Sequence, residues 1–570
     1  MKENINALDE MNKGASMGMD AISFIMDKVE DAKFLKVLKC EYEKYKKMSD
    51  RIRDVYKKYN EDDTPHETNT MTKAMTWWGI EMKTFNDNSN SKIAELLLQG
   101  TNMGIIEGRR ILNNKELVLE SYRKVAEAQK LNASISLIDP IEQLKEEKTG
   151  PLAYVPVALK DNFNMIGTIT TAGSRILENY KSVYDSTVVT KLKEAGAIIV
   201  SKSNMDELAM GGTNLTSFVG ACKNPYDKER ISGGSSGGSA VLTSVGAVPL
   251  AIGSDTGDSV RKPASFNGVV GVKPTYGRIS RYGVIPYASS LDHVGYFTSN
   301  VEDAALALEV LAGRDDKDMT SSYEKVDAYH EFVNQDIKGK KIIVFKNVID
   351  VIENEDVLNS FNKVVEGLKE QGAIIKEVSF NQELLRAIFP VYFIIANAEA
   401  TANHANLTGI PFGRRVDADS AMDIMTKSRT EGFGPWIKKR FTIGSYALFE
   451  ENQERILRKA QKIRRLIVDE VMKELKDADA LIAPASGDVA PLIKGSSLDE
   501  NSDAYLIAEN HMVIENFAGL PSMTLPLTYS KGLPVGINVS SNHFKEGDMF
   551  MIASAIEKIT GLKECLKEEY

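Results

Sequence analysis

The first 112 residues alternate apolar and charged positions with the period of an α-helix. Apolar side chains recur at steps of three, four and seven, and Lys, Glu and Asp fill the positions between them, as in helices that bury one face. Polar segments such as NEDDTPHETN and NDNSNS interrupt this pattern and predict turns. We therefore expect an all-α helical bundle over residues 1–112. Its clearest apolar stripe consists of Leu38, Tyr42, Tyr45, Ile52, Val55 and Tyr59.

From about residue 113 the pattern changes to short apolar runs that alternate with amphipathic segments. The segment DSTVVTKLKEAGAIIVSKSN predicts a helix that ends at Gly196 and is followed by a β-branched strand. NSFNKVVEGLKEQGAIIKEVSF repeats this design with Gly372, and GKKIIVFKN adds another expected strand. Alternating helices and strands predict a layered β-sheet with helices on both sides, so we expect an α/β domain over residues 113–570.

Residues 232–264, SGGSSGGSAVLTSVGAVPLAIGSDTGDSVRKPA, form two glycine- and serine-rich ends around an apolar run. The run fits a buried helix and strand, which excludes a flexible linker, and neither phosphate-loop spacing occurs here. Two catalytic interpretations remain. In the first, GGSSG is a nucleophile elbow. In the second, one serine attacks a carbonyl, another relays its proton, and a lysine is the base. The elbow would take its base from His293, His330, His404 or His511.

Lys160 is the candidate for such a base, because it ends the apolar, strand-like run VPVALK. Burial disfavours the ammonium form of a lysine and lowers its pKa toward neutrality, which allows it to accept a proton. The ordinary alternative is a lysine at the end of a strand that pairs with Asp161. The sequence around Lys160 alone does not decide between a catalytic base and an ion pair with Asp161.

Composition and charge narrow the class of protein. A chain of 570 residues, 43% of them apolar, is long enough for two domains. Its net charge of −10 gives no general basic surface, so we expect no direct binding of nucleic acid. Three scattered cysteines predict neither disulfides nor a metal site. No stretch resembles a signal peptide or a membrane span, so we expect a cytoplasmic protein without membrane contact.

Three motifs together resemble the amidase-signature hydrolases. They are LKDNF with Lys160, GGSSGGSA with Ser235, and GSDTGDSVRKPASFNGVVGVKPTYGRIS with Ser259, and the spacing of the three residues also matches that family. The resemblance covers nearly everything after residue 113 and implies the amidase-signature fold, a layered mixed β-sheet flanked by helices. NMDELAMGG, SRYGVIPYASSLDHVG and NFAGLPSMTLP are most similar to the glutamine-hydrolysing A subunits of Asp/Glu-tRNA amidotransferases.

The resemblance implies a Ser-Ser-Lys triad. Ser259 is the expected nucleophile, Ser235 a bridging serine with unusual peptide geometry, and Lys160 the base. The TGDS turn can aim successive backbone N–H groups at a developing oxyanion, and Asp255 and Arg261 are expected to support the structure. The oxyanion hole would be formed by Thr256, Gly257, Asp258 and Ser259.

The resemblance also implies a set of substrate-binding residues. Tyr392 fits an aromatic wall, Lys439 and Arg440 match a pair that holds the α-carboxylate of glutamine, and Glu509 is the best match for the acid that meets the α-amino group. Lys439 departs from the arginine usual in glutamine-hydrolysing members, and lysine lacks the bidentate fork of arginine.

Two further departures lie beside the nucleophile. Asp258 replaces the usual glycine before the active serine, and Lys262 replaces a common glutamine. The Asp258 carboxylate would slow the enzyme if it repels the oxyanion. Alternatively, it points away and pairs with Lys262, so that the two changes compensate each other.

We therefore expect an amide hydrolase with an appended helical module. The leading hypothesis is glutamine hydrolysis that supplies ammonia for tRNA-dependent transamidation, with B and C subunits as partners. In that case the chain itself needs no cofactor, because ATP and Mg²⁺ would belong to a partner protein of the complex. The alternatives are a stand-alone amidase for another small amide, and a catalytically attenuated binding or scaffold protein.

Overall fold

The computed structural model describes residues 12–57 except 14, 17, 25, 27–28 and 30–31, together with 64–65, 115–494, 502, 504–564, 566–567 and 570. The chain divides into two compact units, Met1–Leu117 and Val118–Tyr570. Residues 58–63 and 66–114, which make up much of the expected helical module, lie outside the described residues.

The described part of the first unit contains the long helix α2, Ala32–Tyr56. This confirms a helix along the apolar stripe, whose Leu38 and Ile52 are buried. Val55, which the pattern places on the same stripe, is 40% exposed, while Tyr56, one residue later, is buried. Tyr56 follows Ile52 by four positions and Val55 follows it by three. A helical turn takes about 3.6 residues, so Tyr56 lies closer than Val55 to the face of Ile52.

The second unit is built on an 11-stranded mixed sheet with the strand order β1-β3-β2-β4-β6-β5-β10-β11-β9-β7-β8. Strands β2, β3 and β4 pair in parallel, as do β7, β8 and β9, and the other pairings are antiparallel. The expected layered mixed sheet is therefore confirmed. Its strands are β1 Ser134–Leu137, β2 Pro156–Lys160, β3 Ile198–Ser203, β4 Leu250–Asp255, β5 Val270–Lys273, β6 His293–Thr298, β7 Lys341–Phe345, β8 Ile374–Val378, β9 Ala480–Pro484, β10 Ser522–Ser530 and β11 Leu533–Ser541.

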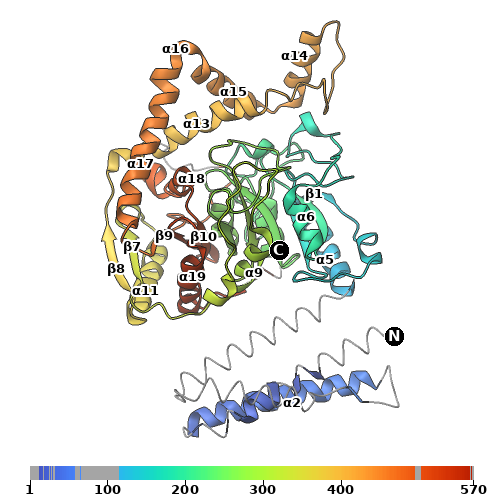
Figure 1. The fold of residues 1–570 in the computed structure, drawn as a ribbon, viewed down its shortest axis with the longest axis vertical. Helices are drawn as coiled ribbons and strands as arrows, with labels where there is room; N and C mark the ends of the chain where they lie inside the picture. The colour runs from blue at the N-terminus through green and yellow to red at the C-terminus, as the bar shows by residue number, and fades with distance from the viewer. Residues whose placement is uncertain are drawn as a thin grey trace. The chain divides into compact units, whose positions relative to one another are not determined.

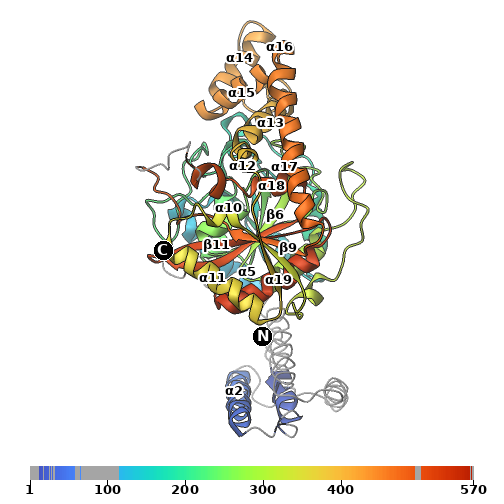
Figure 2. The ribbon, with the colours of Figure 1, turned by 90° about the vertical axis from the view of Figure 1, so that its left-hand side faces the viewer.

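Helices lie on both sides of this sheet, for example α11 and α19 on one side and α18 on the other (Figures 1 and 2). The two predicted helix–glycine–strand units are present, as α6 with β3 and α11 with β8, and Gly196 and Gly372 both have φ +87°. The helices are α5 Lys115–Glu127, α6 Thr187–Glu194, α7 Gly237–Ser244, α8 Arg261–Asn267, α9 Val301–Leu311, α10 Lys346–Ile349, α11 Glu355–Glu370, α12 Gln382–Arg386, α13 Ile388–Asn403, α14 Ala421–Gly432, α15 Pro435–Leu448, α16 Glu450–Asn452, α17 Lys459–Leu475, α18 Val513–Ala518 and α19 Glu546–Thr560.

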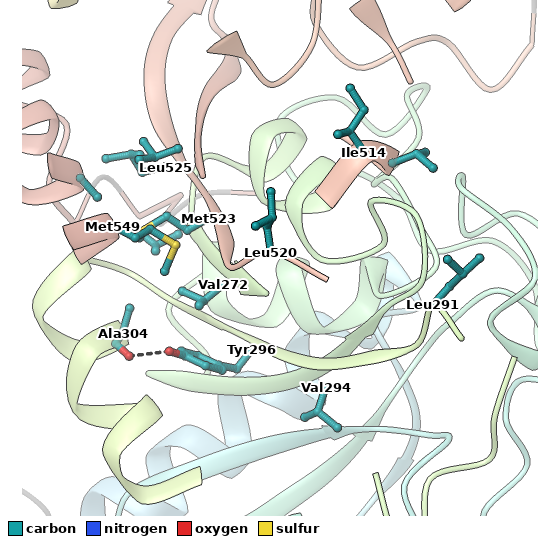
Figure 3. Close-up of a cluster of buried hydrophobic side chains, with 14 of the residues drawn as sticks. Val272, Leu291, Val294, Tyr296, Ala304, Ile514, Leu520, Met523, Leu525 and Met549 are labelled. Carbon is teal, nitrogen blue, oxygen red and sulfur yellow. Dashed lines mark hydrogen bonds between the residues drawn. The ribbon is translucent and has the colours of Figure 1, made fainter. Parts of the chain in front are cut away.

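The main core lies between the middle of the sheet and the helices that cover it. Val272, Tyr296 and Met523 come from neighbouring strands and are fully buried together with Met549 of α19 (Figure 3). Tyr296 donates a hydrogen bond of 2.7 Å from its hydroxyl to the carbonyl of Ala304 in α9, so its polar end is satisfied inside the core. Among the helices that are described, none is both long and apolar enough to cross a bilayer.

Candidate active site

Two parallel strands bring the expected base to one edge of the sheet. Strand β2 ends at Lys160, and its parallel neighbour β4 continues through Ser254 to Asp255. Because the carboxyl ends of parallel strands meet at the same edge, Lys160 and Ser254 lie side by side, with their Nζ and Oγ atoms 2.9 Å apart. The turn that follows β4 carries Ser259. The sheet itself therefore brings two widely separated motifs together.

Lys160 is fully buried and lies among serine oxygens. Its Nζ donates to the Oγ atoms of Ser235 and Ser236, each at 2.8 Å, and to the carbonyl of Ser254 at 3.3 Å. Burial lowers the pKa of Lys160 to about 7, although the charges of Asp206, Asp255 and Asp292 raise it. Asp161 does not pair with Lys160, because its carboxylate lies 2.9 Å from Lys202 Nζ.

The two serines that contact Lys160 have different hydrogen-bond partners. Ser236 donates its hydroxyl proton to the carbonyl of Ser254 at 3.0 Å, so towards Lys160 it can only accept. The Ser235 hydroxyl has no such acceptor among the described residues. It is therefore the hydroxyl that can exchange a proton with the Lys160 amine. Sequence reasoning did not single out Ser236 or Ser254, although both lie within the quoted motifs.

The serine-rich loop before α7 is fixed by close backbone contacts. A Cβ at Gly234 would lie 2.0 Å from Oδ2 of Asp206, so only glycine fits there. The same Oδ2 accepts hydrogen bonds from the N–H groups of Thr213 and Asn214, at 3.1 and 2.8 Å. The peptide bond between Gly234 and Ser235 is cis, in keeping with the unusual geometry expected at this serine.

The turn between β4 and α8 presents a row of unused donors. Val260 N–H is bound by Asp255 Oδ2 at 3.0 Å, but the backbone N–H groups of residues 256–259 donate to no other described residue. The Ser259 hydroxyl likewise has no hydrogen-bond partner in the described chain, including Ser235. Its carbonyl accepts from Ser236 N–H at 3.2 Å, which holds the two serine segments together. N–H groups without another acceptor, next to the candidate nucleophile, are the donors that an oxyanion hole requires.

Asp255 and Arg261 hold this turn in place. Arg261 Nη2 lies 3.0 Å from Asp255 Oδ1 and 2.9 Å from the carbonyl of Gly257, and both side chains are fully buried. Burial alone would raise the pKa of Asp255, but the Arg261 guanidinium holds it well below its usual range. Arg261 also pairs with Glu515 at 3.2 Å. The predicted structural role of Asp255 and Arg261 agrees with these contacts.

The histidine-based elbow finds no support in the described residues. His293 and His511 are buried and bond to backbone carbonyls, His404 is buried, and His330 pairs with Glu309. None of the four makes a hydrogen bond with Ser235 in the part of the chain described. Burial lowers the pKa of His404 and His511 to about 3, which makes both very weak bases.

Helices α13 and α15 carry Tyr392 and Arg440, and Tyr392 lies against the turn of residues 256–259, the nucleophile turn. A Cβ at Gly257 would lie 3.0 Å from the Tyr392 ring, so the ring packs against the turn. Tyr287 stands edge-on to Tyr392, with 6.5 Å between ring centroids, and its hydroxyl accepts from Arg440 Nη1 at 2.7 Å. Arg440 is buried, and its Nε has no partner among the described residues. Lys439 is instead exposed, with its ammonium 5.2 Å from the Trp436 ring centre.

The remaining expected substrate ligand, Glu509, is occupied by the protein itself. Lys262 Nζ lies 2.8 Å from Glu509 Oε2, and Gly487 N–H donates to Oε1 at 2.8 Å. Ser486 Oγ also donates to this carboxylate. Lys262 therefore pairs with Glu509, and the alternative in which it pairs with Asp258 is wrong.

A cavity of about 250 Å³ adjoins the Lys160 environment. Its lining includes Asn162 and Ser254, which bond to each other at 3.1 Å, and Thr256 at the start of the nucleophile turn. Met319, which is 87% exposed, lines the same cavity. The cavity therefore extends from the protein surface to the edge of the sheet where the catalytic candidates gather.

Comparison with known sequences gives one consistent result for the second unit. Residues 116–550 match the family model described as Amidase. The chain is 41% identical to the A subunit of the Glutamyl-tRNA(Gln) amidotransferase of Fusobacterium nucleatum over 463 residues, covering 79% of this chain and 94% of that protein. It is 40% identical to the A subunit of the same enzyme from Lactobacillus acidophilus over 454 residues, covering 78% and 93%.

Solved structures agree with the sequence comparison. The crystal structure of the A subunit of Glutamyl-tRNA(Gln) amidotransferase from Thermotoga maritima superposes with a TM-score of 0.65 at 37% identity, covering 78% of this chain and 90% of that one. A peptide amidase from Stenotrophomonas maltophilia superposes with a TM-score of 0.67 at 26% identity, covering 78% and 93%.

Proposed function

This chain belongs to the amidase family, and from that premise we propose that it hydrolyses the side-chain amide of glutamine and supplies the ammonia to a tRNA-dependent amidotransferase. One observation carries the catalytic part of the proposal. A lysine with a pKa of about 7 is hydrogen-bonded to a serine whose proton is uncommitted, beside a turn with free N–H groups. The similarity to the A subunits of two Glutamyl-tRNA(Gln) amidotransferases supports the physiological part.

The reaction starts with the neutral Lys160 amine. Ser259 Oγ attacks the carbonyl carbon of the amide while Ser235 accepts the Ser259 proton and passes its own proton to Lys160. The carbonyl oxygen becomes an oxyanion and accepts hydrogen bonds from the N–H groups of residues 256–259. Because these donors are already oriented by Asp255 and Arg261, little reorganisation is needed as the charge develops.

The tetrahedral intermediate then collapses and the C–N bond breaks. The proton held by Lys160 returns through Ser235 to the departing nitrogen, which leaves as ammonia, while the acyl group stays on Ser259. Water attacks this ester with the same lysine and serine as base, and the product is the carboxylic acid. For glutamine that product is glutamate, and Ser259 regains its proton.

The choice of glutamine rests on the charges at the far side of the site. Arg440 is a buried cation with an unpaired Nε, held in place by its bond to Tyr287. A buried cation with unused donors is stabilised by an anion, and the α-carboxylate of an amino-acid amide supplies one. A simple aliphatic amide would leave Arg440 without this partner.

The partners and the compartment belong to the same proposal. B and C subunits would receive the ammonia, and ATP and Mg²⁺ would act in one of these partners, so this chain carries no cofactor of its own. Neither tRNA binding by this chain nor membrane contact is part of the proposal, and the compartment that we propose is the cytoplasm.

Ammonia release tests the proposal directly. The purified chain is given L-glutamine, L-asparagine and butyramide, and ammonia is measured with a coupled assay. We expect glutamine to give the highest kcat/KM and Ser259→Ala to give none. A preference for butyramide would support the stand-alone amidase, and failure of a fluorophosphonate probe to label Ser259 would support the scaffold alternative.

A further inference from the structure

The Asp258 carboxylate is the free anion closest in sequence to the nucleophile. Asp258 directly precedes Ser259 and is only partly buried. Its carboxylate has no hydrogen bond or ion pair with any described residue, although its backbone carbonyl accepts from Lys262 N–H at 2.8 Å. A carboxylate in this setting is stabilised by a cation that arrives from outside the protein.

Asp258 shares its surroundings with the other substrate-binding candidates. It directly follows Gly257, whose Cα faces the Tyr392 ring. Burial raises the pKa of Tyr392 well above its usual value, and the charge of Asp258 contributes to the same shift while Arg440 opposes it. Asp258 and Arg440 are therefore charges of opposite sign that both act on Tyr392.

Glu509 is not available for an incoming cation. Its two carboxylate oxygens accept hydrogen bonds from Lys262, Ser486 and Gly487, all at 3.2 Å or less. The Lys262 ammonium neutralises its charge and is itself held by the carbonyl of Ala485 at 2.9 Å. A second ammonium would have to displace Lys262 from a well-formed ion pair.

We propose that Asp258 is the residue that binds the α-ammonium group of the substrate, and that the Lys262–Glu509 pair has taken Glu509 out of this role. This inference rests on glutamine hydrolysis as the proposed function. Arg440 and Asp258 then provide a cation and an anion that match the α-carboxylate and the α-ammonium of one zwitterionic amino acid. The two residues that differ from the family pattern, Asp258 and Lys262, then act together. Lys262 neutralises Glu509, and Asp258 takes over the binding of the ammonium group.

Titration of Asp258 is consistent with this role. Burial raises the pKa of Asp258 to about 6, with Lys262 opposing the shift and Asp255 adding to it. The other charged groups that act on it are Arg261 and Glu509. An ammonium bound against the carboxylate favours its ionised form and lowers the pKa again. Binding of the substrate would thus remove the cost of an unpaired carboxylate near the nucleophile.

A matched pair of amides tests the proposal. L-glutamine and glutaramate have the same carboxylate, chain and amide, and only glutamine carries the α-ammonium. Kinetics are measured on the full chain as wild type, Asp258→Asn, Asp258→Gly and Glu509→Gln, with a melting curve for each. We expect the wild type to favour glutamine, and both Asp258 variants to lose about 10- to 100-fold more in kcat/KM for glutamine than for glutaramate.

The comparison with Glu509→Gln separates the two acids. This variant loses the partner of Lys262, so its effects on the two amides should be similar. Selective loss of glutamine turnover in Glu509→Gln, with no selective loss in the Asp258 variants, overturns the proposal. Equal losses on both amides in the Asp258 variants also overturn it, because Asp258 would then act on the turn. If the wild type hydrolyses neither amide, the proposed function itself fails, and the inference with it.

Discussion

Lys160 Nζ lies 2.8 Å from Ser235 Oγ, and both side chains are fully buried. The lysine comes from the end of β2, and the serine from the loop before α7, so this contact forms only when the sheet has assembled. It combines a base whose pKa burial lowers to about 7 with a hydroxyl that has no other acceptor among the described residues. The contact through which Ser235 would pass its proton to Lys160 is thus present in the free enzyme.

Substitutions of the three residues of the relay should have effects on kcat that do not add. We expect Ser259→Ala to abolish amide hydrolysis, and Ser235→Ala and Lys160→Ala each to lower kcat by about a thousandfold or more. Because both variants break the same proton path, the double variant should be little worse than either single one. Ammonia release under saturating glutamine measures all four. A near-normal rate in Lys160→Ala would contradict the relay.

Ser236 offers a matched control for Ser235, because both hydroxyls lie 2.8 Å from Lys160 Nζ. The Ser236 proton is bound by the carbonyl of Ser254, so it takes no part in the relay. We expect Ser236→Ala to lower kcat by about tenfold at most, through the orientation of Lys160, whereas Ser235→Ala is far more damaging. Similar losses in the two variants would mean that the hydrogen-bond partners do not assign the roles.

The activity should depend on pH through Lys160. A lysine whose pKa is lowered to about 7 is protonated below that pH and cannot accept a proton, and it becomes a base above it. We expect kcat/KM to rise about tenfold per pH unit up to about pH 7 and to level off above it. Measuring thermal unfolding over the same range separates this loss from acid unfolding. A profile that stays flat down to about pH 5 would exclude Lys160 as the base.

Much of the fold follows from local patterns. Gly196 and Gly372 each have a positive φ in the short turn between a helix and the next strand, and such a glycine predicts the end of a helix without knowledge of the pairing partners. Lys160 could be predicted at a strand end for the same reason. The order of the eleven strands could not be derived from such patterns, because it depends on pairings between segments far apart in the chain.

Sequence motifs could predict which residues belong to the site, such as Lys160, Ser235 and Ser259. They could not predict the partner of Lys262, because Asp258 and Glu509 are both acids and only the packing decides which of them the ammonium reaches. Tyr287, which links Arg440 to Tyr392, gave no signal of its own within its motif. The pairing of neighbouring charges is thus the part of the site that requires coordinates.

Variants of Arg440 and Lys439 can test whether the enzyme prefers glutamine, because the two residues are neighbours in sequence but differ in burial. Arg440 is buried against Tyr287, and Lys439 is exposed. We expect Arg440→Met to raise KM for glutamine about tenfold or more while KM for butyramide stays nearly constant, because only glutamine carries the carboxylate that pairs with the guanidinium. Lys439→Met should change both values by less than about threefold. Equal effects on the two amides would favour a stand-alone amidase.

The boundary of the catalytic unit can be tested with two truncations that differ only in α5. Val118 and Val125 of α5 are fully buried in a cluster with Leu131 and Ala158, the latter on the same strand as Lys160. The family match also begins at residue 116. Removing residues 1–112 keeps this helix, whereas removing residues 1–127 deletes it.

We expect the shorter truncation to stay soluble and to be labelled at Ser259 by a fluorophosphonate probe, since every candidate catalytic residue and α5 remain. The longer truncation should melt at a clearly lower temperature or aggregate, because each buried valine contributes roughly 1.5–3 kcal/mol and its loss exposes the cluster behind β2. Melting curves and labelling yields measure both. An insoluble product from the shorter truncation would show that the N-terminal residues are needed for folding and are not a separable module.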